Sequence, residues 1–190
     1  PAIWVAGDSG GGQVQQALSL IGAAGPTQRR RLAELPGAGW FVGGVSWDDR
    51  QIALTKYVSA TESQLWLVNL ASGKLSQLLP APGSKEKAAF LNGGFRRDNS
   101  GIWLVTDRGG EFQQLGLYQL ATRRIVPVTR HIPWDVTGGT TTQDGKLLAV
   151  QANVDGRDEL RLFDARRLKE IETAAAGIPA RARDHGTARR

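Results

Sequence analysis

Five residues near the N-terminus form the motif that could carry the most demanding chemistry. Gly7-Asp8-Ser9-Gly10-Gly11 is the string that surrounds the nucleophile of trypsin-like serine proteases. In that chemistry the serine attacks a carbonyl, and a histidine oriented by a buried aspartate takes its proton. Both partners must precede the serine, whereas only six residues precede this motif. The only histidines, His131 and His185, lie far downstream, so we interpret the motif as a loop.

A second candidate is the oxygen-rich run from Asn153 to Glu159, which has the carboxylate density of a calcium loop. It lacks the spacing of an EF-hand, and Asp155-Gly156 is a strong signal for a hairpin turn. The chain contains no cysteine, which excludes disulfides, thiolate metal sites and cysteine catalysis. His131, close to Pro133, is too isolated to act. We therefore expect no catalytic residue, no cofactor-binding residue and no metal site.

The elements that carry these residues are clearest between Phe95 and Val128. A turn at Asp98-Asn99-Ser100-Gly101 precedes an apolar run, Ile102–Val105, and a loop follows at 107–110. An alternating strand with Leu115, Leu117 and Leu120 comes next, then a short last strand with Ile125 and Val128. Turn residues that bound short β-rich runs are typical of hairpins.

The chain repeats this unit. Residues 48–70 align with 98–120 at an offset of 50 residues, and 144–165 align with it at an offset of 45 or 46. A weaker copy opens the chain, and in it Asp8–Gly11 corresponds to Asp107–Gly110, so the protease-like string is predicted to be an inter-strand loop. A period of 40–50 residues with several short strands is the sequence mark of a propeller blade. A β-sandwich is the alternative, but its strands do not repeat a four-element unit in fixed order.

The predicted fold is therefore an all-β propeller fragment of about four blade units, each a four-stranded antiparallel sheet, with the first incomplete. We predict blades at about 1–35, 39–79, 88–130 and 135–171, within a partial propeller of residues 1–178, and a disordered basic tail at 179–190. The apolar runs Ile102–Val105 and Leu147–Val150 suit strands buried on both faces. Asp48, Asp98 and Asp144 are expected to cap tight turns by bonding to their own backbone.

Six tryptophans are distributed over these units, and for all of them we favour packing over function. Trp4, Trp66 and Trp103 fall within strands and are expected to pack between blades. Trp40, Trp47 and Trp134 fall close to inner strands and could line a central opening, although a core role is favoured for them too.

The net charge of +6 and a pI near 10.2 raise the question of nucleic-acid binding. The arginine pairs 30–31, 123–124 and 166–167 fall at the start of the last strand in three repeats, where charged side chains block edge-to-edge aggregation. We infer that they are dispersed over separate rims, and we expect no nucleic-acid partner. No apolar run is long enough to span a bilayer, so we expect no membrane partner. The chain has no methionine, even at position 1, so we expect it to begin inside a longer reading frame.

The segments GGFRRDNSGIWLVTDRGGEFQQLGLYQL, TRHIPWDV and TTQDGKLLAVQANVDGRDELRLFD carry a family likeness. They resemble the N-terminal β-propeller of the prolyl oligopeptidase family, in its bacterial dipeptidyl-peptidase and acylaminoacyl-peptidase branch. Residues 90–165 carry the resemblance, and His131–Val136 favours this branch over TolB-like propellers, which share the generic blade pattern.

The resemblance implies a non-catalytic propeller that covers an α/β-hydrolase domain and admits only short peptides to a Ser-Asp-His triad. The nucleophile elbow, G-x-S-x-G in a strand–turn–helix context, belongs to that domain, and no catalytic residue is transferred to this chain. The implied partners are an α/β-hydrolase domain of the same polypeptide and peptide substrates. The localisation stays open between bacterial cytoplasm and periplasm. The loop expected to contact a partner is Asp107, Arg108, Gly109, Gly110 and Glu111.

Two alternatives stay open. One is a TolB-like or other propeller module that binds a protein or a carbohydrate and has no hydrolase partner. The other is a self-contained four-bladed or dimer-closed scaffold, in which open blade edges lead to self-association.

Overall fold

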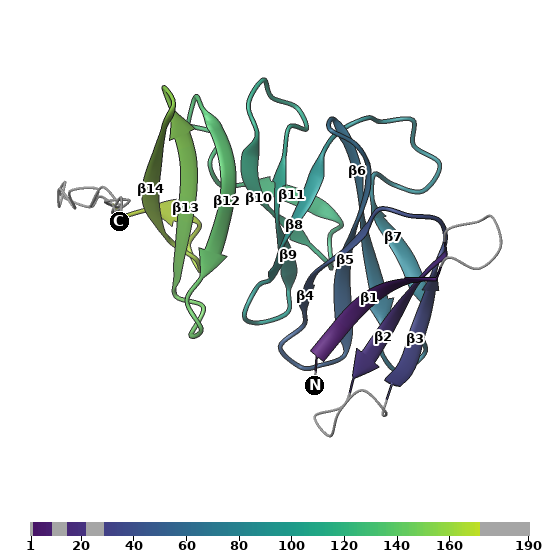
Figure 1. The fold of residues 1–190 in the computed structure, drawn as a ribbon. Helices are drawn as coiled ribbons and strands as arrows, with labels where there is room; N and C mark the ends of the chain where they lie inside the picture. The colour runs from purple at the N-terminus through teal and green to yellow at the C-terminus, as the bar shows by residue number, and fades with distance from the viewer. Residues whose placement is uncertain (1, 9–14, 22–28, 172–190) are drawn as a thin grey trace, which may run out of the picture.

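The computed structural model describes residues 2–8, 15–21 and 29–171, and within them every regular element is a β-strand. The strands form four antiparallel sheets, numbered here in chain order (Figure 1). Sheet 1 contains β1 (Ala2–Asp8), β2 (Gln15–Ile21) and β3 (Arg29–Leu35). Sheet 2 contains β4 (Trp40–Val45), β5 (Gln51–Ser59), β6 (Glu62–Asn69) and β7 (Leu75–Leu79). Sheet 3 contains β8 (Phe90–Phe95), β9 (Gly101–Thr106), β10 (Gln114–Gln119) and β11 (Arg124–Pro127). Sheet 4 contains β12 (Asp135–Thr141), β13 (Leu147–Val154), β14 (Arg157–Asp164) and β15 (Lys169–Glu170).

In each sheet the strands lie in chain order, so that every connection within a sheet joins neighbours. This confirms the predicted all-β fold class, with several four-stranded antiparallel sheets and a first unit that has three strands. The exact division into a propeller at 1–178 and a tail at 179–190 stays a prediction, because residues 172–190 lie outside the described part of the chain.

The same turn connects the first two strands of sheets 2, 3 and 4. Its left-handed residue is Asp49 (φ 55°), Asn99 (φ 58°) or Gly145 (φ 66°), and the N–H of that residue donates to the carbonyl three residues earlier. Asn, Asp and Gly are the residues that tolerate this backbone region. A local sequence rule therefore sets the register of three sheets.

Sheet 3 lies between two neighbours and is buried on both faces. All six residues of β9 are buried. Ile102 and Leu104 belong to a core cluster shared with sheet 2, whereas Trp103 and Val105 belong to one shared with sheet 4. A third cluster, between sheets 1 and 2, includes Leu18. Since successive residues of a strand point to opposite faces, the continuous apolar run of β9 supplies both cores, as predicted.

The corresponding prediction for Leu147–Val150 is wrong on one face. Leu148 and Val150 are buried against sheet 3, but Leu147 is 39% exposed and Ala149 is only partly buried. Sheet 4 is the last described sheet, so no described sheet packs on its outward face.

The tryptophans fall into two groups. Trp40 and Trp103 are each 2% exposed, and Trp66 packs edge-on against Trp40 at a centroid distance of 5.4 Å. Trp47 and Trp134 are 41% and 36% exposed, so neither has a core role. Instead, the guanidinium group of Arg97 lies over the Trp47 ring, 4.2 Å from the ring centroid. The side chain of Trp4 lies outside the described part.

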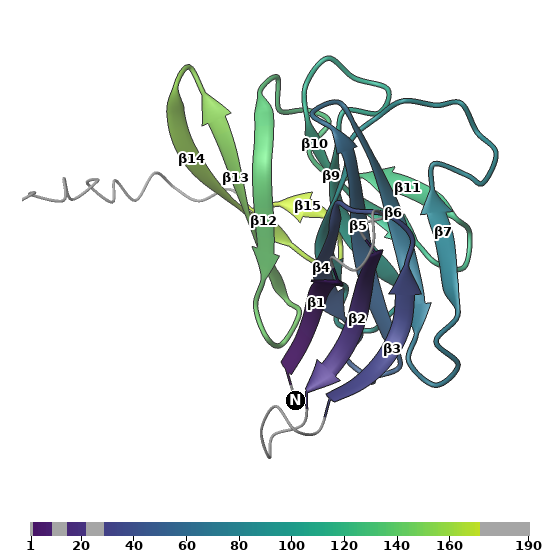
Figure 2. The same cartoon turned by 45° about the vertical axis from the view of Figure 1, so that its right-hand side comes forward.

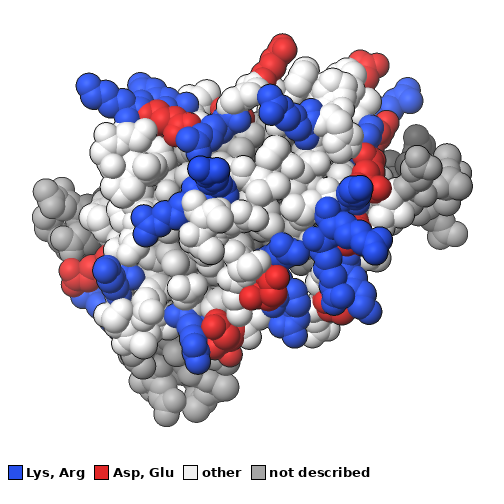
Figure 3. Space-filling view, turned by 180° about the vertical axis from the view of Figure 1, so that it is seen from behind, with Lys and Arg blue, Asp and Glu red and all other residues white. Residues whose placement is uncertain are grey.

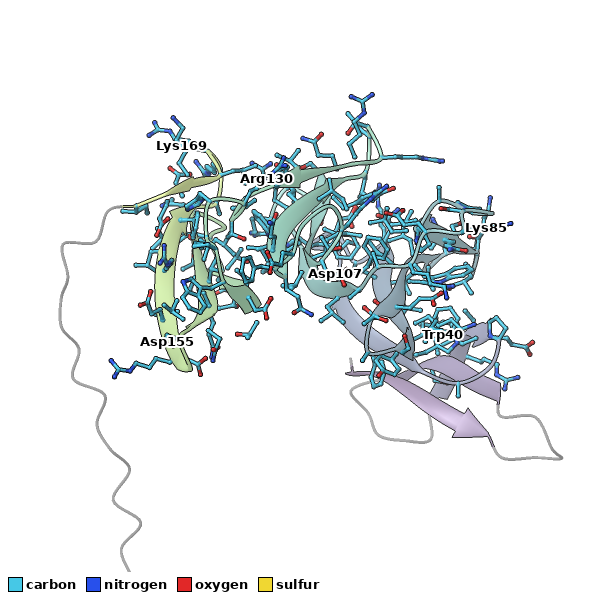
Figure 4. All side chains as sticks on the ribbon, turned by 90° about the horizontal axis from the view of Figure 1, so that it is seen from above. Trp40, Lys85, Asp107, Arg130, Asp155 and Lys169 are labelled. Carbon is cyan, nitrogen blue, oxygen red and sulfur yellow. The ribbon has the colours of Figure 1, made fainter. Side chains whose placement is uncertain are left out.

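The four sheets are arranged along an arc. Seen from above, the labelled residues Arg130 and Lys169 lie on the convex side and Trp40 and Asp155 on the other (Figure 4). The last strands of sheets 2 and 3, β7 and β11, lie on the side away from β4 and β12 (Figure 2). Lys and Arg side chains stand in several groups over the rear face, some of them beside carboxylates (Figure 3).

Candidate functional site

The protease-like string lies between two described strands and not between a strand and a helix. Its letters do fit G-x-S-x-G, but Gly7 and Asp8 end β1, and the next element is β2, which pairs antiparallel with β1 from Asp8↔Gln15 onward. An elbow requires a strand followed by a helix. Ser9, Gly10 and Gly11 lie outside the described residues, as does His185. Strand order therefore supports the loop interpretation.

The predicted calcium-like run is a hairpin. Asp155 (φ 49°) and Gly156 (φ 76°) form the two-residue turn between β13 and β14, whose pairing continues to Val154↔Arg157. Two positive φ angles are the signature of a type I′ turn. In residues 2–8, 15–21 and 29–171, no three His, Cys, Asp or Glu side chains lie together as metal ligands. The same residues contain no helix long and apolar enough to cross a bilayer.

His131 has structural partners. Its Nε2 lies 2.6 Å from Glu170 Oε2, and Arg161 Nη1 lies 3.5 Å from the other carboxylate oxygen of Glu170. These residues connect the crossing after sheet 3 with the last two strands of sheet 4. The histidine thus supports the joint between two sheets.

The loop predicted to contact a partner is divided between internal and external roles. Asp107 Oδ1 accepts the backbone N–H of Ala89 at 2.8 Å, and Arg108 Nε lies 2.6 Å from Glu86 Oε1. Both contacts reach the crossing from sheet 2 to sheet 3. Gly109, Gly110 and Glu111 are exposed, and Gly109 has φ +72°. Gly109, Gly110 and Glu111 are thus the exposed residues of this loop for which no contact with the crossing is seen.

A repeated hydrogen-bond joint connects successive sheets beside this loop. The Gln113 N–H donates to Asp135 Oδ1 at 2.8 Å, and the Gln113 carbonyl accepts from Val136 at 2.9 Å. One sheet earlier, Ser63 occupies the place of Gln113. Its N–H donates to the Ala88 carbonyl at 3.1 Å, and its hydroxyl accepts from Phe90 at 2.6 Å. The start of the third strand of one unit thus positions the first strand of the next.

The repeated aspartates cap turns, as predicted. Asp48, Asp98 and Asp144 accept the backbone N–H two residues later, at 3.3, 3.0 and 3.0 Å. A hydrogen bond from Ser46 is the main reason why the pKa of Asp48 is lowered, and one from Thr142 lowers the pKa of Asp144 to about 2. Partial burial acts to raise the pKa of Asp98, but the bonds from Ser100 and the charge of Arg96 outweigh it. These aspartates are scaffold groups.

A groove over β10 and β11 is the feature that the sequence reasoning missed. It has a volume of about 560 Å³, and four of its lining residues are Arg108, Arg123, Arg124 and Arg130. No carboxylate lines it. The three arginine pairs lie in three different sheets, as inferred, but in sheet 3 one pair, Arg123-Arg124, converges with a loop arginine and a crossing arginine that the inference did not consider. The signal in the sequence was the excess of arginine in this repeat over its sister repeats.

Comparison with known proteins identifies the fold and no family. No family profile matches the sequence, and no curated protein matches it. Solved structures do match. TolB from Acinetobacter baumannii aligns with a TM-score of 0.60 and 14% identity, over 86% of this chain and 38% of TolB.

Two further matches come from enzymes. A prolyl endopeptidase aligns with a TM-score of 0.65 and 12% identity, over 89% of this chain and 25% of that enzyme. A puromycin hydrolase mutant complexed with PGG aligns with a TM-score of 0.57 and 16% identity, over 89% of this chain and 26% of that protein. The chain thus spans less than half of each of these proteins. It shares a propeller-type β fold with prolyl oligopeptidase-family and TolB structures.

Proposed function

We propose that this chain is the non-catalytic propeller portion of a serine peptidase of the prolyl oligopeptidase family. In this proposal it docks on an α/β-hydrolase domain outside residues 1–190 and limits access to peptide substrates. The observation that supports the proposal most is the alignment of 89% of the chain with part of a prolyl endopeptidase, at a TM-score of 0.65. The motifs of residues 90–165 point to the same family.

The docking contact that we propose is the exposed tip Gly109-Gly110-Glu111. Its base is fixed by Asp107 and Arg108, which bond to the preceding crossing, so the tip is held on a rigid support. Glu111 offers a negative charge whose contribution to docking can be reversed by substitution. Such a contact on the rim of an interface changes affinity modestly and depends on salt.

The experiment uses the complete protein encoded by the gene. It should hydrolyse a chromogenic dipeptide substrate, and residues 1–190 alone should not. Glu111→Lys should lower kcat/KM roughly 2- to 10-fold, whereas Asp158→Lys, an exposed charge reversal in sheet 4, should leave it unchanged. Hydrolysis by the isolated chain, or equal effects of both substitutions, would contradict the proposal.

A TolB-like binding module is the second candidate, because TolB from Acinetobacter baumannii aligns over 86% of the chain. In that case the propeller binds a protein or a carbohydrate and no hydrolase domain accompanies it. A complete protein that binds such a ligand and has no peptidase activity would favour this candidate.

A further inference from the structure

We propose that the groove over β10 and β11 binds an extended acidic peptide segment of a partner protein, through Arg108, Arg123, Arg124 and Arg130. The groove's volume of about 560 Å³ lies in the range of ordinary ligand pockets. Thr106 and Gln114 add polar side chains to its lining. The groove adjoins the docking tip, since Arg108 and Gly109 belong to its lining, but the peptide proposal involves neither Gly110 nor Glu111.

Three of the four arginines of the groove are not neutralised by a described carboxylate. Arg123, Arg124 and Arg130 form no ion pair and no side-chain hydrogen bond with any described residue, whereas Arg108 is paired with Glu86. Other turn arginines of the chain have a carboxylate nearby, such as Arg50 with Asp48 and Arg96 with Asp98. The groove, in contrast, has three guanidinium groups that are not paired with a described carboxylate. Guanidinium groups form strong paired hydrogen bonds with carboxylates.

Sheet 2 shows that the blade scaffold does not require these arginines. The two sheets have the same pairing register, since Lys56↔Gln64 in sheet 2 corresponds to Thr106↔Gln114 in sheet 3 at the offset of 50 residues. The positions of the four arginines are occupied there by Val58, Gly73, Lys74 and Pro80. At these four positions sheet 2 has a single cationic side chain, Lys74, whereas sheet 3 has four. The cluster of arginines is therefore a feature of sheet 3 and not a requirement of the fold.

Arg123 lies at a turn position whose residue type differs between the sheets. Its N–H donates to the carbonyl of Gln119 with φ +56°, and Gly73 makes the same turn bond to Asn69 with φ +68°. In sheet 4 Leu168 makes this bond to Asp164 with φ +58°. The turn therefore does not require one residue type, and only in sheet 3 does it place a guanidinium group in the lining of the groove.

The distribution of charge selects an extended ligand over a compact anion. Arg123 and Arg124 stand at one end of β11, while Arg108 and Arg130 stand beyond its other end. From Arg124 to Pro127 the strand rises about 10 Å, so the arginines are attached at two separate ends of the strand and suit a ligand whose charges are spread along its length. On a peptide in the extended polyproline II conformation, acidic side chains three residues apart lie on the same side, about 9 Å from each other, and match this spacing.

The groove's lining also distinguishes a peptide from single-stranded nucleic acid. None of its lining residues is aromatic, whereas single-strand binders stack bases on aromatic rings. Pairing of the peptide as an additional strand on the edge of β11 is disfavoured. The backbone groups of β11 that point away from β10 belong to Ile125 and Pro127, and Pro127 has no N–H to donate. Side-chain contacts from the arginines must therefore carry the binding.

The test is fluorescence anisotropy with the purified protein and a labelled peptide of about ten residues that has glutamate at every third position. We expect saturable binding that weakens with salt, and no binding of the matching glutamine peptide. The double variant Arg123→Gly with Arg130→Gln should weaken binding at least about tenfold. Arg123→Gly copies the sister turn, and a thermal melt confirms folding of both variants.

The matched control is Arg166→Gln with Arg167→Gln, which removes the same charge from sheet 4. It should change the affinity less than about twofold. Equal weakening by both double variants would overturn the proposal in favour of nonspecific attraction. Absence of saturable binding, or tighter binding of an oligothymidylate than of the peptide, would also overturn it.

Discussion

Leu115 on β10 and Leu160 on β14 occupy equivalent positions in neighbouring sheets, and only Leu115 is covered. Leu115 pairs with Val105 and is 1% exposed, whereas Leu160 pairs with Gln151 and is 67% exposed. Leu65, the third member of the series, is 0% exposed. The side chain that seals one joint between sheets thus faces outward on the last described sheet.

Leu115→Ala and Leu160→Ala should therefore differ strongly in their effect on stability. Leu115→Ala leaves a cavity in the core between sheets 3 and 4 and should lower the free energy of unfolding by about 2–5 kcal/mol. Leu160→Ala should change it by no more than about 0.5 kcal/mol. Urea unfolding followed by tryptophan fluorescence measures both. Similar losses would mean that Leu160 is covered in solution.

The outward face of sheet 4 should also promote self-association of the isolated chain. Leu147, Leu160 and Ile171 are 39%, 67% and 37% exposed there, and exposed apolar patches on sheets favour association. Sedimentation equilibrium should show a mass that rises with concentration, and Leu160→Lys should reduce it. A concentration-independent monomer in the unsubstituted chain would count against this expectation.

The turns of sheets 3 and 4 touch at Gly145. This residue has φ +66°, and a Cβ built on it would overlap the Cβ of Arg97. Gly145→Ala should therefore destabilise the chain by about 1 kcal/mol for the backbone and about 1–3 kcal/mol for the overlap.

Gly83→Ala is the matched control, because Gly83 has φ +81° and open space around it. It should show only the backbone cost. Adding Arg97→Gly to Gly145→Ala removes the overlapping Cβ and should recover part of the loss. Thermal melts of the four proteins test this, and equal losses at Gly83 and Gly145 would argue against contact between the turns.

Acid should weaken the turns through their aspartates. The pKa of Asp144 is about 2 in the folded chain, compared with an ordinary value of 3.8, mainly because the Thr142 hydroxyl donates to its carboxylate at 2.6 Å. A lowered pKa in the folded state means that the stabilisation is fully present above pH 3.8. It is then lost as the pH falls towards 2.

Asp144→Asn should lower stability at neutral pH and should reduce the fall in stability between about pH 4 and 2. Thr142→Val should act in the same direction, since it removes the donor that lowers the pKa. Urea midpoints measured over that pH range provide the test. If stability falls between about pH 4 and 2 in both variants as much as in the unsubstituted chain, Asp144 does not contribute to that fall.

The repeat made the sheets predictable because their turns depend on local chemistry. Asp98, with the left-handed residue after it, defines a turn within a few residues of sequence, and the same pattern recurs near Asp48 and Asp144. The fate of Leu147 and Leu160 was not predictable, since burial depends on whether a further sheet packs against them. The sequence contains an excess of arginine in this repeat but does not show the groove itself, because Arg108, Arg123 and Arg130 meet only after β9, β10 and β11 pair. Likewise, the bonds of Asp107 to Ala89 and of Arg108 to Glu86 connect a loop with a crossing that is separate from it in the sequence.

The measurement that tests the central claim most directly is labelling of the complete protein with a fluorophosphonate probe, followed by peptide mapping. A serine peptidase of the proposed family should be labelled on one serine outside residues 1–190, and its peptidase activity should be lost in proportion. Failure of the complete protein to react, or labelling of Ser9 within this chain, would contradict the account.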